Sequence, residues 1–172
     1  MNDIIKICSC TGHRPKGFTW NYNDKDCESH KAYLNKLQII IEKFIKEGFN
    51  YFISGGAIGA DMDFAETIIR LRNKYPFIKL EIAVPCKNQS LLWTSNQKVR
   101  YENILMCADK VNLISEKYTS QCMYERNRYL VDSSDLLLAV WNGLESGGTF
   151  YTINYAKKKN KRIEFLELYS LL

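Results

Sequence analysis

The sequence predicts an α/β protein: a single Rossmann-like, three-layer domain in which a mostly parallel sheet lies between two layers of helices. Short apolar runs rich in β-branched residues alternate with longer segments whose apolar residues recur at helical spacing. One short run, residues 136–140, is apolar at every position, which is typical of a strand buried on both faces. The length of 172 residues suits one domain over residues 1–172.

Six short runs are expected to form the strands of this sheet. They are mainly apolar, and turn residues or polar residues separate them from the segments that follow. They are residues 4–10, 51–54, 79–84, 110–114, 134–140 and 163–166. Strands separated by helices join through right-handed crossovers, which make the sheet mostly parallel and place helices on both of its faces.

Five segments between these runs are expected to be helical. The first begins near His30 with Ser29 as its cap, repeats apolar residues every three or four positions, and stops at Gly48. The other four are residues 62–73, 91–107, 122–131 and 147–159.

The composition is that of an ordinary globular protein, with 46% hydrophobic and 25% charged residues. No apolar run reaches the roughly 18 residues of a membrane-spanning helix, and the start of the chain lacks the basic-then-apolar order of a secretion signal. We therefore expect a cytoplasmic protein with no membrane partner. The net charge of +5 permits an anionic partner without requiring one. For the basic run 157–162 we favour a solvated helix end over a nucleic-acid patch.

The six cysteines indicate reduced thiols in a packed core rather than a metal site. No two are spaced as Cys-x-x-Cys, and the chain has only two histidines, His13 and His30. Cys8 and Cys10 alternate along the first strand and should face the same side of the sheet. We predict no metal and no bound cofactor.

Two glycine-rich loops, each after a strand-like run and before a helix, are the strongest functional signal. A strand that turns through glycines into a helix directs backbone N–H groups and the positive helix end at one place, which suits phosphate. The ligand-binding residues predicted from these loops and from the loop after the first strand are Thr11, Gly12, His13, Arg14, Ser54, Gly55, Gly56, Gly59, Asp61, Asn142, Gly143, Gly147, Gly148 and Thr149.

The spacing of these glycines excludes two common nucleotide-binding motifs. The first loop reads Gly-Gly-x-x-Gly rather than Gly-x-Gly-x-x-Gly, which disfavours dinucleotide redox chemistry. The chain also has no Gly-Lys-Ser/Thr loop, which disfavours ATP hydrolysis of the P-loop kind.

Charged side chains near these loops each have a functional and a structural interpretation. Arg14 could clamp a phosphate through both guanidinium nitrogens, or could anchor its long loop to Asp24 or Asp26. His13 could donate a proton near a phosphate, or form a structural hydrogen bond. Asp61 could accept ribose hydroxyls, or stabilise the helix N-terminus.

Further along the chain the same alternatives stay open. Glu66 could face the cleft or lie in a contact between helices. Arg126 and Arg128 are two residues apart on a helix, so at most one faces the cleft, and the other could pair with Asp132. Candidates for stacking on a base are Trp20, Tyr22 and Trp93.

Three motifs, taken in order, resemble those of one superfamily. They are Cys-Thr-Gly-His-Arg-Pro at 10–15, the first glycine loop at 54–61, and Glu-Arg-Asn-Arg at 125–128 followed by Ser-Asp at 134–135 and Gly-Gly-Thr at 147–149. They resemble the SLOG superfamily, which includes DprA (Smf) and the LOG phosphoribohydrolases, and most closely its YpsA-like branch. The resemblance covers nearly the whole chain. It implies a Rossmann-like fold with a pocket for nucleotides or nucleotide-derived ligands.

The resemblance also bears on activity. LOG hydrolases carry a catalytic glutamate three residues after the threonine of the second glycine loop, and here that position is Thr152. The arginine of LOG proteins corresponds to Arg126, which makes Arg126 the favoured cleft residue. DprA-like members bind single-stranded DNA, usually with extra domains that are not found in this sequence. SLOG proteins are often dimers, so the resemblance is also compatible with a homodimer.

We therefore expect a protein that binds a nucleotide-like small molecule between its two glycine loops, as a sensor or regulator. One alternative is an N-glycosidic hydrolase of nucleotides with Arg126, Glu66 and Asp61 as its catalytic groups. A second alternative is binding of single-stranded nucleic acid. Whether the protein is an enzyme stays open at this point.

Overall fold

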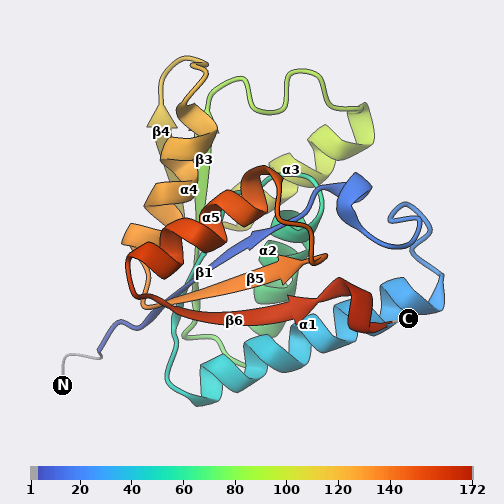
Figure 1. Cartoon of the computed structure of the whole chain (residues 1–172). Helices are drawn as coiled ribbons and strands as arrows, with labels where there is room; N and C mark the ends of the chain where they lie inside the picture. Colours follow the sequence, from blue (N-terminus) through green and yellow to red (C-terminus); the bar gives the residue numbers. More distant parts are fainter. Residues whose placement is uncertain (1–3, 172) are drawn as a thin grey trace.

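The computed structural model describes residues 4–171 and confirms the α/β architecture (Figure 1). All strand pairs in the described sheet are parallel. The strands are β1 (Ile7–Gly12), β2 (Tyr51–Ser54), β3 (Lys79–Cys86), β4 (Lys110–Ser115), β5 (Leu136–Trp141) and β6 (Arg162–Glu167). The helices are α1 (Glu28–Lys46), α2 (Ala60–Leu71), α3 (Ser95–Cys107), α4 (Cys122–Asp132) and α5 (Gly147–Lys158), with short 3-10 turns η1 (Pro15–Gly17) and η2 (Leu168–Leu171).

The strand order β4-β3-β2-β1-β5-β6 sets the position of the functional site. The chain builds outward from β1 to β4, then returns through α4 and places β5 on the other side of β1. Helices α1, α2 and α3 cover one face of the sheet, and α4 and α5 cover the other (Figure 1). Ligands in such folds bind beyond the carboxyl ends of the strands where the strand order reverses, which here is the gap between β1 and β5.

The first strand and first helix differ from their predicted bounds. The strand begins at Ile7, where pairing with Tyr51 of β2 starts, and runs on to Gly12 because β5 continues the ladder on its other side. Ile4 and Ile5 lie before it and are exposed, so their apolar character does not mark a buried strand. Helix α1 begins at Glu28, two residues before the predicted start, so its N-cap is Cys27 and Ser29 lies inside the helix.

The third strand and third helix also shift. Residues 91–94 are not helical, because a capping box between Thr94 and Gln97 starts α3 at Ser95. Strand β3 runs through Pro85 to Cys86. Its pairing with β2 ends at Ile82, so the proline lies beyond the neighbouring strand and costs no ladder bond on that side.

The largest apolar cluster lies between the sheet and the α1–α3 layer, and smaller clusters lie under α4 and α5. Cys8 and Cys10 both belong to the large cluster and are fully buried, which confirms that they face one side of the sheet. Burial raises the pKa of both thiols, so they are protonated packing residues.

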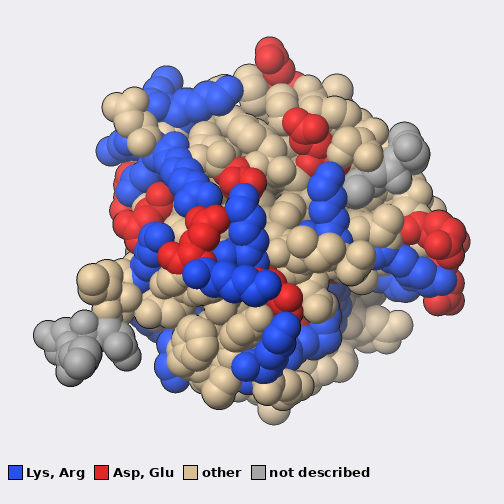
Figure 2. Space-filling model, turned by 90° about the horizontal axis from the view of Figure 1, so that it is seen from below, with Lys and Arg blue, Asp and Glu red and all other residues tan. Residues whose placement is uncertain are grey.

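The basic run predicted at a helix end lies at the end of α5 and the start of β6. Lys159 pairs with Asp132, and Arg162 pairs with Glu47 at 2.8 Å. Lys and Arg side chains are interleaved with Asp and Glu on the side of the molecule seen from below in Figure 2. No helix within residues 4–171 has the length and apolar character needed to cross a membrane. The residues Met1–Asp3, which entered the expectation about a secretion signal, lie outside the described part.

Candidate functional site

A cavity of about 350 Å³ opens at the carboxyl ends of β1 and β5, where the strand order reverses. Four regions that are distant in sequence contribute to its walls: the end of β1 with the loop after it, the first glycine loop with the start of α2, one side of α4, and the first turn of α5. The lining residues are Thr11, Gly12, His13, Arg14, Gly17, Ala57, Asp61, Met123, Arg126, Asn127, Leu130, Gly148 and Thr149.

The N-terminus of α5 is open toward this cavity. Gly148 and Thr149 line it, and no acidic residue occupies the first turn of the helix. Ser146, at the N-cap position, makes no side-chain capping bond. Gly147 has a positive φ of 80°, and no other group lies within 4 Å of the place where a Cβ would stand. The first N–H groups of a helix have no intrahelical partner, so this end can receive an anion.

Arg126 is the buried cation of the site, with only 6% of its surface exposed. Its Nη1 donates to the carbonyl oxygen of Gly55 at 2.6 Å, and its Nε donates to Asn127 Oδ1 at 3.0 Å. Among the described residues, its Nη2 has no hydrogen-bond partner. Burial lowers the pKa of Arg126, because the charged guanidinium is removed from water. Since Nη2 is free, the guanidinium can still donate to a negatively charged group in the cavity.

Asp61 faces Arg126 across the cavity floor. Its Oδ2 lies 3.7 Å from Arg126 Nη1 and accepts the N–H of Ala57 at 3.3 Å. Burial raises the pKa of Asp61, and the nearby guanidinium offsets this only in part because the two groups are beyond hydrogen-bond distance. Its other carboxylate oxygen can accept a hydroxyl.

The first glycine loop forms the wall behind the cavity and does not line it, apart from Ala57 and Asp61. The hydroxyl of Ser54 donates to the carbonyl oxygen of Asp61 at 2.8 Å and accepts the N–H of Gly56 at 3.1 Å. The N–H groups of Gly56 and Ala57 are therefore already bonded within the loop. Gly55 is required because a Cβ there would overlap the guanidinium of Arg126.

The loop after β1 packs directly on the start of α2. The carbonyl oxygen of His13 accepts the N–H of Ala60 at 3.1 Å, and a Cβ on Gly59 would overlap that oxygen. Gly12 fits closely between Ala60 and Val140. This packing holds the loop of the first predicted motif against the first glycine loop.

The two ionisable residues of this loop lie at the cavity. The imidazole of His13 lines it with a buried Nε2 that has no partner, and burial lowers the pKa of this histidine. Arg14 is exposed at the cavity rim and makes no ion pair with Asp24 or Asp26 among the described residues. Arg14 therefore does not anchor its loop to either aspartate, which was the structural interpretation given for it.

Asn142 and Gly143 stand outside the cavity. Asn142 Nδ2 donates to the carbonyl oxygen of Gly17 at 3.0 Å, and its Oδ1 accepts the N–H of Leu144 at the same distance. These bonds tie the loop after β5 to η1. Gly143 has a positive φ of 86° beside the ring of Tyr169. Both residues shape the second loop and have no direct access to the cavity.

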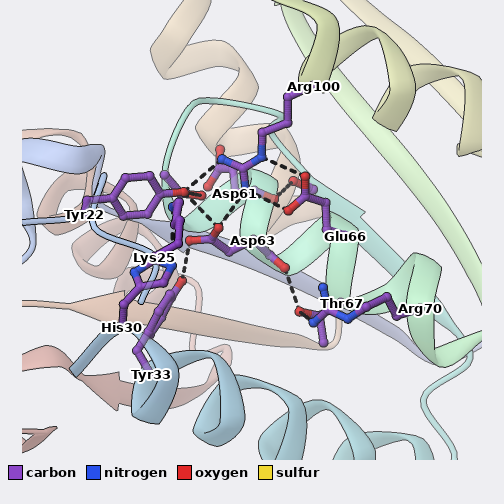
Figure 3. A network of polar contacts seen from close by, with 12 residues as sticks. Tyr22, Lys25, His30, Tyr33, Asp61, Asp63, Glu66, Thr67, Arg70 and Arg100 are labelled. Carbon is purple, nitrogen blue, oxygen red and sulfur yellow. Dashed lines mark hydrogen bonds and ion pairs between the residues drawn. The ribbon is translucent and has the colours of Figure 1, made fainter. Parts of the chain in front are cut away.

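Glu66 is turned away from the cavity. Its carboxylate accepts hydrogen bonds from Arg100 Nε at 2.7 Å and Nη2 at 2.8 Å across the contact between α2 and α3 (Figure 3). This is the helix–helix contact that the sequence left open as the alternative for Glu66. Its position gives no support to the predicted catalytic role.

The same close-up (Figure 3) shows that Tyr22 is engaged in a hydrogen-bond network away from the cavity. Its hydroxyl donates to Asp63 Oδ1 at 2.8 Å, and Tyr33 and Arg100 also donate to the carboxylate of Asp63 (Figure 3). The segment between β1 and α1 is thereby fastened to α2. Trp20 donates to His30 Nδ1 at 3.2 Å inside this aromatic cluster. None of the three candidate aromatic residues lines the cavity, since Trp93 packs edge-on against Tyr101.

The two arginines of α4 separate as the helical spacing requires. Arg126 faces the cavity and Arg128 does not line it. The expected pair of Arg128 with Asp132 does not form, because Asp132 accepts from Tyr155 at 3.0 Å and pairs with Lys159.

The residue list derived from sequence missed Asn127. It is buried, accepts the Nε–H of Arg126, and its Nδ2 lies 3.7 Å from the place of a Cβ on Gly148. It therefore connects the buried cation to the N-terminus of α5. The signal for it was present, because Asn127 stands inside the Arg-Asn-Arg block quoted for the resemblance.

Comparisons with known proteins identify the family of the chain. A family model described as the YspA SLOG family matches residues 8–171. The chain belongs to this SLOG family. It is 36% identical over 137 residues to the SPbeta prophage-derived protein YoqJ of Bacillus subtilis (strain 168), covering 72% of this chain and 80% of that protein. It is 29% identical over 170 residues to UPF0398 proteins of Bacillus thuringiensis (strain Al Hakam) and Bacillus cereus (strain AH187), covering 98% of this chain and 91% of each.

Membership of the SLOG family is consistent with nucleotide-related binding and with a LOG-like fold. At the position of the LOG glutamate, the hydroxyl of Thr152 donates to the carbonyl oxygen of Gly148 at 2.8 Å. Thr152 is fully buried in the first turns of α5. This chain therefore has a buried, backbone-bonded threonine at the position where LOG proteins have a carboxylate, and Thr152 is not among the residues that line the cavity.

Proposed function

We propose that this SLOG protein binds a nucleotide or nucleotide-derived ligand with its phosphate at the N-terminus of α5. One observation carries the proposal: the buried guanidinium of Arg126 and the uncapped end of α5 face the same cavity. A phosphate there would accept from helix N–H groups and from Arg126 Nη2, and would neutralise a cation whose burial is only partly compensated. Arg14 at the rim adds a second positive charge.

The ribose of such a ligand would lie toward Asp61. A carboxylate accepts two hydroxyl groups, as vicinal ribose hydroxyls require, and this carboxylate has an oxygen that the loop leaves free. The cavity volume of about 350 Å³ lies at the lower end of the range of small-molecule sites. These features favour a ligand with one sugar–phosphate unit inside the cavity.

The arrangement favours binding over cleavage. Asp61 is the single carboxylate among the cavity-lining residues of the described chain. Glu66 is held by Arg100, and Thr152 is bonded to the backbone of α5. Glycoside hydrolysis usually needs two carboxyl groups on opposite sides of the scissile bond. We therefore propose a sensor or regulatory binding role.

The proposal is tested by calorimetry and thermal shift against nucleoside mono- and diphosphates, cyclic nucleotides, ADP-ribose, inorganic phosphate and the unphosphorylated nucleoside. We expect phosphorylated ligands to bind and the nucleoside to bind much more weakly. Arg126→Gln should lower affinity by about tenfold or more. Arg128→Gln, on the same helix and outside the cavity, should leave affinity unchanged.

Two results would overturn the proposal. One is the absence of binding by every ligand of the panel at millimolar concentration. The other is equal loss of affinity in Arg126→Gln and Arg128→Gln, which would indicate a non-specific charge effect. If chromatography detected free base released from any nucleotide of the panel, the protein would instead be an N-glycosidic hydrolase.

A further inference from the structure

His13 lines the cavity, and the proposed function gives it no role. Its imidazole forms part of the cavity wall, and its Nε2 is buried without a hydrogen-bond partner. Burial lowers the pKa of His13, so the ring of the free protein is neutral at neutral pH. A neutral imidazole has one N–H group, whereas a protonated imidazole donates from both ring nitrogens. The ring therefore holds a protonation site that the free protein leaves unused.

Neighbouring segments hold the ring of His13 in place. The carbonyl oxygen of His13 accepts the N–H of Ala60 at 3.1 Å, at the start of α2. Gly17 of η1 lies so close to the imidazole that a Cβ at this glycine would overlap it. Asn142 Nδ2 donates to the carbonyl oxygen of Gly17 at 3.0 Å, so the loop after β5 keeps η1 against the ring. These contacts position the imidazole before a ligand binds.

The charged groups around His13 come from four parts of the fold. They are Arg14 and Lys16 in and before η1, Asp61 and Asp63 in α2, Arg126 in α4, and Glu145 in the loop before α5. Lys16 and Glu145 are exposed to solvent, and Asp63 belongs to the network of Figure 3. Burial alone accounts for the lowered pKa of His13, and none of these charges contributes to it. An anion inside the cavity would therefore be a new influence on the ring.

The fixed charges at the cavity wall are too few to balance a dianion. Among the described lining residues, Arg14 and Arg126 are positive and Asp61 is negative, which leaves one net positive charge. The N-terminus of α5 adds the equivalent of about half a charge. A phosphate monoester carries about 1.5 to 2 negative charges at neutral pH. Uncompensated charge away from water is costly, and a titratable group beside it reduces that cost by taking a proton.

We propose that His13 takes up a proton when a phosphomonoester enters the cavity. The proton comes from the solvent and remains on the imidazole while the ligand is bound, and no bond of the ligand changes. The inference rests on the proposed function and adds that ligand binding depends on pH. Affinity falls as the pH rises through the range between the pKa of His13 in the free protein and its higher pKa in the complex.

Calorimetry in two buffers of different ionisation enthalpy measures this proton. The probe is a nucleoside 5′-monophosphate above about pH 6.5, where its phosphate is mostly dianionic. We expect an uptake of about half to one proton per bound ligand, and an affinity that falls by up to about tenfold per pH unit. A cyclic nucleotide carries one negative charge and should cause a much smaller uptake. Equal uptake with both ligands would overturn the proposal.

Two variants identify the group that holds the proton. His13→Gln should abolish the uptake and weaken binding of the monophosphate by about tenfold. The matched control is His30→Gln, which changes the only other histidine of the chain at a position that does not line the cavity. It should leave the uptake unchanged. Uptake that persists in His13→Gln would overturn the proposal.

Proton resonances of the two imidazoles follow the same event in the unmodified chain, with His30→Gln to assign the signals. In the free protein His13 should titrate below 6.5, and saturating nucleoside monophosphate should raise its pKa by about one unit or more. The pKa of His30 should not move. If the ligand binds while the pKa of His13 stays the same, this inference fails and the proposed function stands. If no phosphorylated ligand binds, both fail.

Discussion

Arg126 runs directly beneath Gly55, and its Nη1 donates to the carbonyl oxygen of that glycine at 2.6 Å. The two residues are 71 positions apart in sequence and come from α4 and from the loop after β2. A side chain on Gly55 would occupy the space of the guanidinium. The absence of a side chain at Gly55 thus makes room for the guanidinium of Arg126. The free N–H groups at the cavity come from the N-terminus of α5 and not from the first glycine loop.

Substitution of Gly55 by alanine should remove the arginine from its place. The added Cβ overlaps the guanidinium, and overpacking of this kind costs about 1–3 kcal/mol in the free energy of unfolding. Urea unfolding measures the loss, and phosphate-ligand affinity should fall with it. Gly148→Ala is the matched control for stability, because its Cβ meets no atom nearer than 3.7 Å. Equal stability of both variants would contradict the described packing.

Substitution of Ser54 by alanine should weaken the same loop from within. The hydroxyl bonds both the carbonyl oxygen of Asp61 and the N–H of Gly56, and its loss leaves the buried N–H of Gly56 without a partner. We expect a loss of about 1–3 kcal/mol in the free energy of unfolding. Ser115→Ala, which removes an exposed hydroxyl bonded to Lys117, should cost much less. Hydrogen exchange at Gly56 should accelerate in Ser54→Ala alone.

Substitution of Asp63 by asparagine should destabilise the contact among α1, α2 and α3. Its carboxylate, 3% exposed, accepts from Tyr22, Tyr33 and Arg100. An amide cannot accept all three bonds, and breaking a buried ion pair costs about 3 kcal/mol or more. Glu66→Gln removes a more exposed partner of the same arginine and should cost less. Chemical denaturation measures the loss in the free energy of unfolding for each variant. A larger loss in Glu66→Gln than in Asp63→Asn would contradict the prediction.

Stability should depend on pH through His30. Burial, reinforced by Lys25 Nζ at 3.3 Å from Nε2, lowers its pKa from 6.5, and the neutral ring accepts the Nε1–H of Trp20 at Nδ1. Asp63 and Arg100 also act on this histidine, with opposite signs. A lowered folded-state pKa means that the unfolded chain binds the proton more readily. The free energy of unfolding should therefore be retained above pH 6.5 and fall as the pH drops below it.

The histidine dependence is measured by urea unfolding at a series of pH values on both sides of 6.5. His13 contributes with the same sign, because burial lowers its pKa as well. His30→Gln should flatten the dependence in part, and a second substitution, His13→Gln, should flatten it further. A rise in stability on acidification through this window would contradict the assigned direction.

Sequence pattern predicted the elements well where the signal was local. The strand 51–54 and the start of the helix at Gly147 match the structure, since glycines mark the boundaries of these segments. Ile4 and Ile5 misled the prediction of β1, because apolar character alone does not say whether a neighbouring strand is present to bury a residue. The capping box at Thr94 was likewise outweighed by the apolar residues before it.

The candidate site was likewise predicted only in part, where its residues follow from local sequence signals. Thr11 to Arg14, Asp61, Gly148 and Thr149 were predicted as ligand-binding residues and line the cavity, because they lie at or beyond the carboxyl ends of β1, β2 and β5. Several other residues were predicted as site residues and are not among those that line the cavity: Ser54, Gly55, Gly56, Gly59, Glu66, Asn142, Gly143 and Gly147. The orientation of a side chain depends on the partner that meets it, and the partner of Glu66 is Arg100, 34 residues away.

The amino-acid sequence by itself determined the alternation of strands and helices, the glycine turns and the motifs of the SLOG family, because these depend on local spacing and residue type. Only the tertiary structure decided that α4 returns beside β1 and carries Arg126 under Gly55. It also decided that the amides of the first loop are bonded internally. Strand order arises from packing between distant segments, which periodicity along the chain does not encode.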